Sequence, residues 1–310
     1  MIVAGAALGV SGKAIAGRPT IAPGLQLYTL SNVIGEDCSA VLAEIGRMGY
    51  REVELPPVFT SASADRRLIY RARADWPFIK GVLRDSGLRC RSVHVLPQRL
   101  PGLDLPTLET HLSEQIEFAH YIGASYLVCA LYYIPPRLQS ALSSFGEEAV
   151  SNLLLLDDWR AAADFLSRIS RELRRSGLTL AYHNHHLELK RFGDVVALDE
   201  LLVHADPDVK LEMDCGHLAS AGHDPVRFLQ RYPGRIPLLH VKDISAPGAS
   251  IYDTTASVEI GSGIIDWHAL FRAAREAGVV QYYVEQDGPF ARPVLESVRT
   301  SYDYLRSING

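Results

Sequence analysis

The chain has 310 residues, of which 47% are hydrophobic and 22% are charged, and 31 Lys and Arg against 36 Asp and Glu give a formal net charge of −5. This composition is that of an ordinary globular protein and excludes an intrinsically disordered chain and a fibrous repeat. The mild acidity argues against a protein that binds nucleic-acid backbones, and the length suits two small domains or one barrel of about 250 residues.

Residues 1–20 differ in composition from the rest of the chain. Residues 1–16 are small and apolar apart from Lys13, and Ala14-Ile15-Ala16 fits a small-x-small cleavage site. The stretch matches either the later half of a secretory signal peptide without its basic start or a loosely packed tail, and it is too short and glycine-rich for a stable transmembrane helix. We therefore expect one domain over residues 21–310, in a protein that is periplasmic or secreted in the first case and cytoplasmic in the second.

From residue 23 onward, short apolar runs alternate with longer amphipathic ones. The apolar runs are rich in Val, Leu, Ile and Tyr, which is typical of buried parallel strands, and they cover residues 24–30, 52–56, 91–96, 126–133, 178–185, 209–214, 236–243 and 281–287. The amphipathic runs predict helices over residues 39–49, 75–87, 105–123, 158–177, 194–205, 224–232, 266–278 and 292–308. Several begin at Asp, the first at Ser39, and several end at Gly, as helix caps do. Eight alternations without a glycine-rich dinucleotide fingerprint predict a single closed (β/α)8 TIM barrel.

Two longer connections interrupt this alternation. Residues 134–157 follow the fourth predicted strand and contain Pro135-Pro136 and a serine-rich middle, and residues 245–263 follow the seventh. Both leave the carboxyl ends of strands, where long loops usually cover or border an active site.

Titratable side chains gather at the carboxyl ends of at least six predicted strands. Side chains two positions apart share a face of a strand, which pairs His183 with His185, His240 with Lys242, and Glu285 with Asp287. Glu54, His94 and Asp214 stand at the ends of three further strands. Barrel interiors are normally filled by Val, Ile and Leu, so these polar groups carry a desolvation cost that something must offset.

A divalent cation would offset that cost. His183, Asp214, His240 and Glu285 lie on four consecutive strands, and two imidazoles with two carboxylates suit Mn²⁺, Co²⁺, Fe²⁺ or Zn²⁺ better than Ca²⁺. We predict that these four residues bind one divalent ion, with Mg²⁺ also open. The alternative is a hydrogen-bonded polar layer without a metal.

The remaining polar residues near the strand ends are weaker candidates for a direct role in the site. Glu54, His94 and His185 have a strong alternative as structural groups or as groups behind the ligands. We expect Glu52 and Glu212, which lie deeper along their strands, to be structural or exposed. His186, His204, His223 and His268 lie in turns or on helices and are expected to be ordinary surface residues.

The four cysteines, Cys38, Cys90, Cys129 and Cys215, are far apart and form no CxxC pair. This spacing argues against a disulfide framework and against a structural zinc knuckle. We expect four buried or partly buried free thiols.

Several segments resemble the sugar phosphate isomerase/epimerase family, which has the xylose isomerase-like TIM barrel. They are residues 181–189 (AYHNHHLEL), 211–229 (LEMDCGHLASAGHDPVRFL), 238–243 (LLHVKD), 258–271 (VEIGSGIIDWHALF) and 282–287 (YYVEQD). The block over residues 211–287 is specific, and the resemblance over the rest of the chain from residue 24 is looser. The resemblance implies that Asp214, His240 and Glu285 are metal ligands and that His217, in an Asp-x-x-His element, contacts substrate. Ketose epimerases of this family have a glutamate at the position of His183, which serves as one of two opposed bases. The histidine should preserve metal binding but removes one carboxylate base from a symmetric epimerisation.

The chemistry expected of such a site follows from the metal. A divalent ion that binds a sugar carbonyl and a neighbouring hydroxyl stabilises an enediolate, so the adjacent C–H becomes acidic enough for a protein base. This predicts a metal-dependent carbohydrate isomerase or epimerase. A lyase or dehydratase that eliminates from a keto-sugar or 3-keto-glycoside is the first alternative, and a non-catalytic carbohydrate-binding barrel is the second.

The predicted roles divide over a few residues. Glu285 is the expected base, with His185 or His183 as the imidazole on the other side. Lys242 would bind substrate oxygens or stabilise oxyanion charge, or else form a structural salt bridge with Glu212 or Asp243. Glu54, His94, His217 and Lys242 are the candidate substrate contacts.

The expected partner is a small carbohydrate, and neither a nucleic acid nor a membrane. A phosphodiesterase of the AP-endonuclease type would need a trinuclear zinc cluster with more ligands than the sequence offers, together with a basic DNA-binding face. The sequence leaves open the identity of the sugar, its phosphorylation, the metal and the oligomeric state, a homo-oligomer included.

Overall fold

The computed structural model describes residues 21–35, 37–57, 59–60, 67–68, 73–98, 107–131, 133–248 and 257–309. The predicted N-terminal segment, residues 1–20, and residues 249–256 of the second long connection lie outside these ranges.

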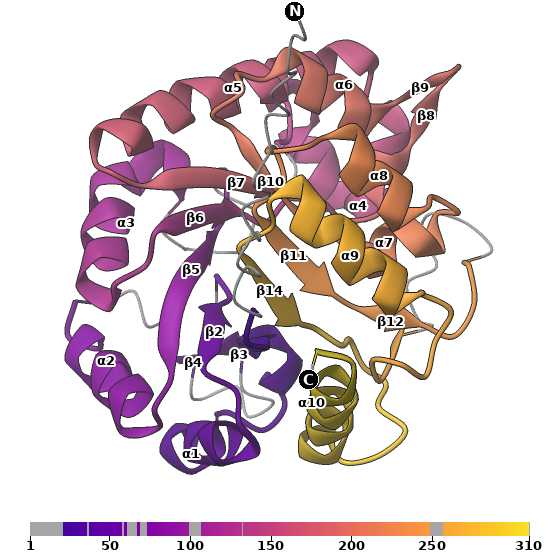
Figure 1. The fold of residues 1–310 in the computed structure, drawn as a ribbon. Coiled ribbons are helices and arrows are strands. Elements are labelled where there is room, and N and C mark those ends of the chain that lie inside the picture. Colours follow the sequence, from indigo (N-terminus) through magenta and orange to yellow (C-terminus); the bar gives the residue numbers. More distant parts are fainter. Residues whose placement is uncertain are drawn as a thin grey trace, which may run out of the picture.

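Eight parallel strands close into a barrel in the order in which they occur along the chain. They are β1 (Gly24–Gln26), β2 (Glu52–Leu55), β5 (Arg89–Val95), β6 (Tyr126–Cys129), β7 (Thr179–His183), β10 (Lys210–Asp214), β11 (Leu238–Val241) and β14 (Gln281–Val284). The barrel closes where β14 pairs with β1, with Gly24 opposite Tyr283, and the helices surround it (Figure 1). The predicted TIM barrel is confirmed.

Most of the helices follow the predicted ones with shifts of a few residues at their ends, whereas two, Gln139–Leu153 and Cys215–Ser220, were not predicted. The helices are α1 (Cys38–Met48), α2 (Trp76–Asp85), α3 (Leu108–Ile122), α4 (Gln139–Leu153), α5 (Leu156–Arg175), α6 (Ala197–His204), α7 (Cys215–Ser220), α8 (Pro225–Arg231), α9 (Trp267–Ala277) and α10 (Val294–Asn309). The side chains of Asp224 and Asp266 cap α8 and α9. Asp37, and not Ser39 as predicted, caps α1, because its Oδ1 accepts a hydrogen bond from the Ala40 amide. In the ranges described, no helix has both the length and the apolar character that crossing a membrane requires.

Short elements lie between these strands and helices. The 3-10 turns are η1 (Leu27–Leu30), η2 (Pro136–Leu138) and η3 (Leu187–Leu189). Three antiparallel pairs join β3 (Phe59–Thr60) to β4 (Arg67–Leu68), β8 (Arg191–Phe192) to β9 (Val195–Val196), and β12 (Asp243–Ile244) to β13 (Ser257–Val258).

Two predicted elements differ from the structure. The first strand ends at Gln26, because the Gln26 side chain accepts a hydrogen bond from the Tyr28 amide and the chain turns into η1. The predicted connection 134–157 is largely helical, since it forms η2 and α4. Leu138, Leu142 and Val150 recur at multiples of four and pack against the core, so one face of this serine-rich segment is apolar at helical spacing.

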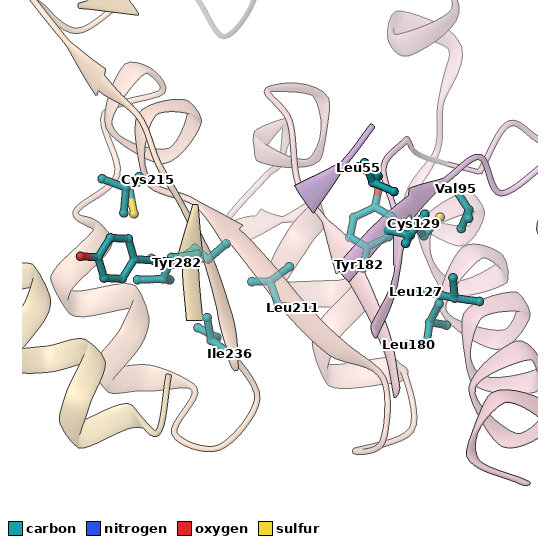
Figure 2. Packing of buried hydrophobic residues seen from close by; sticks show 14 of the residues in the cluster. Leu55, Val95, Leu127, Cys129, Leu180, Tyr182, Leu211, Cys215, Ile236 and Tyr282 are labelled. Atoms are coloured by element: carbon teal, nitrogen blue, oxygen red, sulfur yellow. The ribbon is translucent and has the colours of Figure 1, made fainter. Parts of the chain in front are cut away.

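The main core lies between the strands and the surrounding helices. Outward-facing strand residues such as Val53, Val93, Leu127 and Leu180 are completely buried there, and Figure 2 shows Leu127 and Leu180 directed toward the neighbouring helices. Leu211 and Tyr282 belong to the same cluster. The four cysteines are free thiols, three of them buried and Cys38 partly exposed, as predicted.

A second, smaller apolar cluster fills the inside of the barrel. Val128, Ala181, Leu238 and Tyr283 form it, and all four are completely buried. Because alternate strand residues share a face, the next inward-facing residues on three of these strands are His183, His240 and Glu285. Along each of these three strands, the inward-facing residues therefore change from apolar to polar within two positions. The polar site begins at that level of the barrel.

Candidate functional site

The four predicted metal ligands come together at the carboxyl ends of β7, β10, β11 and β14. His183, Asp214, His240 and Glu285 each offer one ligand atom, and these atoms all lie within 4.8 Å of one another. All four side chains are buried. The register explains the convergence, because Asp214 pairs with His240 on the neighbouring strand and the barrel turns both side chains inward.

The donor set fits a divalent cation. His240 Nδ1 lies 3.1 Å from Glu285 Oε2 and 4.0 Å from Asp214 Oδ2. His183 Nδ1 is buried and has no hydrogen-bond partner among the described residues, and the buried Asp214 Oδ2 makes an ion pair with Lys242 Nζ at 3.2 Å but no hydrogen bond. Buried polar atoms without partners are costly, and two nitrogen and two oxygen donors match the preferences of Mn²⁺, Co²⁺, Fe²⁺ or Zn²⁺.

Electrostatics in this cluster are set by burial and by close charges. Burial alone would lower the pKa of His240, but Glu212 and Glu285 raise it well above its usual value. Burial, helped by His240 and His185, holds the pKa of His183 well below its usual value. The two imidazoles therefore differ in proton affinity although they are neighbours.

Lys242 lies among three carboxylates at the mouth of the site. Its Nζ is 2.8 Å from Glu285 Oε2, 2.8 Å from Asp287 Oδ2 and 3.2 Å from Asp214 Oδ2. These partners differ from Glu212 and Asp243, which the structural alternative had named. Gly216 makes room for the lysine stem, because a Cβ at this position would lie 2.7 Å from Lys242 Cγ.

The lysine and the predicted base hold each other in their charged forms. Burial would lower the pKa of Lys242, but Asp214, Asp287 and Glu285 raise it well above its usual value. Burial would raise the pKa of Glu285, but Lys242 and His240 hold it well below its usual range. Glu285 is therefore an ionised carboxylate beside an ammonium group.

Further histidines form a row beside His183. The ring centroid of His185 lies 4.6 Å from that of His183 and 5.3 Å from that of His217. Burial, followed by Lys242, lowers the pKa of His185 to about 3, so its ring is neutral at neutral pH. His185, one of the two imidazoles expected to serve opposite Glu285, therefore does not have the ordinary imidazole pKa near 6.5.

The other predicted surface histidines divide into two groups. His204 and His268 are exposed and His223 is half-buried. His186 is half-buried and its ring centroid is 5.9 Å from that of His217. His186 therefore lies beside the site, and its expected place on the ordinary surface was wrong.

Glu54 and His94, the deeper candidate substrate contacts, lie behind His240. Glu54 Oε2 is 2.6 Å from His240 Nε2 and 2.9 Å from His94 Nε2. Gln26, which the sequence analysis did not single out, donates a hydrogen bond of 2.8 Å to the same Glu54 oxygen. All three side chains are buried. Glu54 contacts the Nε2 side of His240, whereas Glu285 faces its Nδ1 side.

Glu212 belongs to this deeper layer, so of the two roles expected for it, structural or exposed, the exposed one is excluded. It is completely buried, and its Oε2 lies 2.8 Å from His94 Nε2 and 3.2 Å from His240 Nε2. The alternation of the strand could have identified it, because Glu212 precedes Asp214 by two positions and shares its inward face. Glu52 is structural, since its carboxylate lies 2.8 Å from Arg89.

Two further residues support the site from its rim. Asn184 Oδ1 accepts a hydrogen bond from the Asp214 amide at 3.1 Å. Asp243 is completely buried, and its Oδ2 accepts hydrogen bonds from the Gly261 amide, the Gly263 amide and Trp267 Nε1 at 2.9, 3.1 and 2.9 Å. Neither role follows from spacing in the sequence, because each depends on a segment that only the folded chain brings near.

Comparisons with known proteins agree with this architecture. The model of the xylose isomerase-like TIM barrel family matches residues 42–308. An inosose dehydratase from Geobacillus kaustophilus is 27% identical over 213 residues, which are 66% of this chain and 61% of that protein. The chain thus spans about three fifths of the length of that relative.

Two solved structures share the fold. A sugar phosphate isomerase/epimerase from Parabacteroides distasonis has a TM-score of 0.71 at 23% identity, over 97% of this chain and 98% of the other. An IolI protein with a bound zinc atom has a TM-score of 0.66 at 15% identity, over 93% of this chain and 98% of the other. At these identities the likeness shows the fold alone.

Proposed function

Because the chain belongs to the xylose isomerase-like TIM barrel family, we propose that it is a divalent-metal-dependent dehydratase of a sugar-like ketone. The enzyme would remove the proton next to the carbonyl and eliminate a hydroxyl from the following carbon. The observation that carries this proposal is the convergence of two imidazoles and two carboxylates within 4.8 Å, with Lys242 beside Glu285. The name of the curated relative, inosose dehydratase, supports elimination from a cyclic polyol ketone.

The proposed cation seat consists of Asp214, His240 and Glu285, and His183 completes the set of four. When bound, the cation supplies Lewis acidity at the substrate carbonyl. The protein groups supply the rest: Glu285 takes the proton from carbon, and the C–H electron pair becomes a double bond as the neighbouring C–O bond breaks. Lys242 is protonated and only 2.8 Å from Glu285, so it can give a proton to the leaving hydroxyl, which departs as water.

Isomerisation or epimerisation, the first prediction from the sequence, begins with the same removal of a proton. Epimerisation on this fold needs a second base, which in the ketose epimerases is a glutamate at the position of His183. Here an imidazole stands at that position. The two other carboxylates near Glu285 are those of Asp214 and Asp287, and both contact Lys242. One carboxylate base, Glu285, next to one protonated ammonium group, Lys242, favours elimination.

The test is a ketone screen in D₂O with the chain supplied with Mn²⁺ or Co²⁺, using inososes and 3-keto-glycosides. A dehydratase yields a product lighter by one water, whereas an isomerase or epimerase gains deuterium at carbon and keeps all its oxygen. The same chain with excess chelator is the control and should do neither. If no ketone loses water or exchanges its α-proton with metal present, the proposal is wrong, and sugar binding without exchange would indicate a non-catalytic barrel.

A further inference from the structure

An aromatic side chain stands beside the polar groups at the mouth of the site. Tyr28 lies in η1, directly after β1, and is 50% exposed, although its neighbours Leu27, Thr29 and Leu30 are all buried. We propose that the ring of Tyr28 packs against the face of a substrate that carries its ketone in a six-membered ring. This inference rests on the proposed function and adds to it a residue that recognises the shape of the substrate.

The pairing of β1 with β14 places Tyr28 beside the carboxyl end of β14. Leu25 lies opposite Val284, and the same register, continued along both segments, places Tyr28 level with Asp287. Asp287 Oδ2 lies 2.8 Å from Lys242 Nζ. Tyr28 therefore stands next to a carboxylate that holds the proposed proton donor.

The backbone on both sides of Tyr28 is held by hydrogen bonds. Gln26 Oε1 accepts one of 3.1 Å from the Tyr28 amide, and Gln26 Nε2 donates one of 2.8 Å to Glu54 Oε2. Thr29 Oγ1 accepts one of 3.1 Å from the Gln286 amide, which keeps η1 against the end of β14. A ring on a backbone that is already fixed loses little conformational freedom when a substrate packs against it.

The electrostatic surroundings of Tyr28 place its phenol near the reacting groups. Burial is the largest cause of the raised pKa of Tyr28, and the charges of Asp287 and Glu285 raise it further. Lys242 acts in the opposite direction. Coulomb interactions weaken with distance, so the phenol lies close to these three groups. It is an uncharged wall beside a carboxylate and an ammonium group.

The two sides of the mouth suit different parts of a cyclic polyol. His185 and His217 follow β7 and β10, and Lys242 lies between them and Tyr28, because β11 stands between β10 and β14 in the barrel. A six-membered polyol ring has hydroxyls around its edge and C–H groups on its two faces. Imidazoles and charged groups suit the hydroxyls, and an aromatic ring suits the C–H face. An open-chain ketone has no such face, so Tyr28 favours a cyclic one.

Exposure alone would not single out Tyr28, because isolated exposed aromatic residues are ordinary on protein surfaces. Phe78 on the outer helix α2 is 48% exposed. Tyr28 differs from it by standing level with Asp287, next to the proposed catalytic pair of Glu285 and Lys242. Phe78 is therefore a matched control for the removal of an exposed ring.

The test measures ketone binding by isothermal titration calorimetry at saturating Mn²⁺. The full chain carries Glu285→Gln, so that the ketone is not consumed. The cyclic probes are an inosose and methyl 3-keto-β-glucopyranoside. The open-chain probe is erythrulose, an α-hydroxyketone that is too short to close a five- or six-membered ring.

Tyr28→Ala should weaken binding of the cyclic ketones by about tenfold and leave erythrulose nearly unchanged. Tyr28→Phe keeps the ring and should bind within about threefold of the parent chain, and Phe78→Ala should match the parent with every probe. Unchanged binding of the cyclic ketones by Tyr28→Ala would overturn the proposal, and so would an equal loss for erythrulose. Failure of both cyclic ketones to bind the parent chain at millimolar concentration would also overturn it.

Turnover by chains that keep Glu285 tells this proposal apart from the proposed dehydration. A ring that binds substrate and transition state alike affects KM, so Tyr28→Ala should raise KM by about tenfold and largely keep kcat. If a cyclic ketone binds through Tyr28 but never loses water, the dehydration is wrong and the role of Tyr28 stands. If water is lost with an unchanged KM in Tyr28→Ala, the dehydration stands and the role of Tyr28 is wrong.

Discussion

Glu285 and Lys242 lie 2.8 Å apart in a buried setting, and each depends on the other for its charged form. Both groups are thereby in the protonation states that elimination needs, an ionised acceptor and a protonated donor, while the same mutual stabilisation makes Glu285 a weaker base and Lys242 a weaker acid than the free groups. Asp214 and Asp287 share the lysine, so removal of Glu285 would leave the ammonium partly compensated.

Glu285→Gln should therefore fold and lose most of its activity. We expect turnover to fall by about 10²-fold or more, as for other general bases. Because Glu285 is also a proposed ligand, rates are compared at saturating metal, with Glu296→Gln on the exposed face of α10 as a control that keeps full activity. α-Proton exchange at the wild-type rate in metal-loaded Glu285→Gln would contradict the assignment.

Asp243 has a structural role, since its buried carboxylate holds residues 261–267 against the barrel. Asp243→Ala leaves several buried N–H groups without an acceptor, and we expect a loss of about 3 kcal/mol or more in the free energy of unfolding. Asp243→Asn keeps one acceptor oxygen and should lose less. Urea unfolding measures both, with the exposed Asp194→Ala as a control. Equal stability of Asp243→Ala and wild type would show that this carboxylate is not an anchor.

At the level of elements, the end of α1 joins early and late parts of the chain. Gly49 ends α1 in the left-handed region, with a φ of 117°. The next residue, Tyr50, donates a hydrogen bond to the Val298 carbonyl of α10 and its ring lies 4.9 Å from that of Tyr302. A Cβ at position 49 would lie 2.1 Å from the Tyr302 hydroxyl oxygen.

Two glycine substitutions separate backbone strain from this close contact. Gly123 ends α3 at a φ of 91°, and no neighbouring atom lies within 4 Å of the place that a Cβ would take there. Gly123→Ala should therefore lose only the strain of a left-handed alanine, about 1–2 kcal/mol. Gly49→Ala adds the collision with Tyr302, for which we expect about 1–3 kcal/mol more. Thermal or urea unfolding compares the two variants. If both variants lose the same free energy of unfolding, α10 moves away from the new Cβ at position 49 at little energetic cost.

For the whole molecule, cation binding should stabilise the folded barrel. Its ligands stand on strands that the unfolded chain does not hold together, so the ion binds the folded state preferentially. At a hundred times the dissociation constant this adds about 2.7 kcal/mol, which raises the midpoint of thermal unfolding by about 4 °C for a chain of this size.

Scanning calorimetry with Mn²⁺ and with chelator measures this shift. Asp214→Asn is the informative variant, because its amide oxygen can still accept the hydrogen bond that Asp214 Oδ1 receives from the His217 amide at 2.7 Å. The variant should therefore fold but show a smaller shift with Mn²⁺. An undiminished shift would place the stabilising ion elsewhere in the molecule.

The sequence by itself determined the architecture and the upper part of the site. The hydrophobic period changes from strand to helix eight times, so the barrel could be predicted without any long-range information. The ends of β10, β11 and β14 follow from the same pattern, and so does the inward face shared by Glu212 and Asp214 once alternation is applied strictly. Helix α4 escaped prediction because its core-packing residues Leu142 and Val150 are widely spaced among serines.

The tertiary structure decided which polar groups meet and in what state of charge. Glu54 and His240 are 186 positions apart in the sequence, yet Glu54 Oε2 lies 2.6 Å from His240 Nε2. Lys242 contacts Asp214, Glu285 and Asp287 instead of its predicted partners. Local periodicity fixes the face on which each side chain lies, but the distance between two side chains depends on how the barrel closes. Coulomb interactions and desolvation vary steeply with that distance and depth, so the deeper layer around Glu212 and the low pKa of His185 emerge only from the folded molecule.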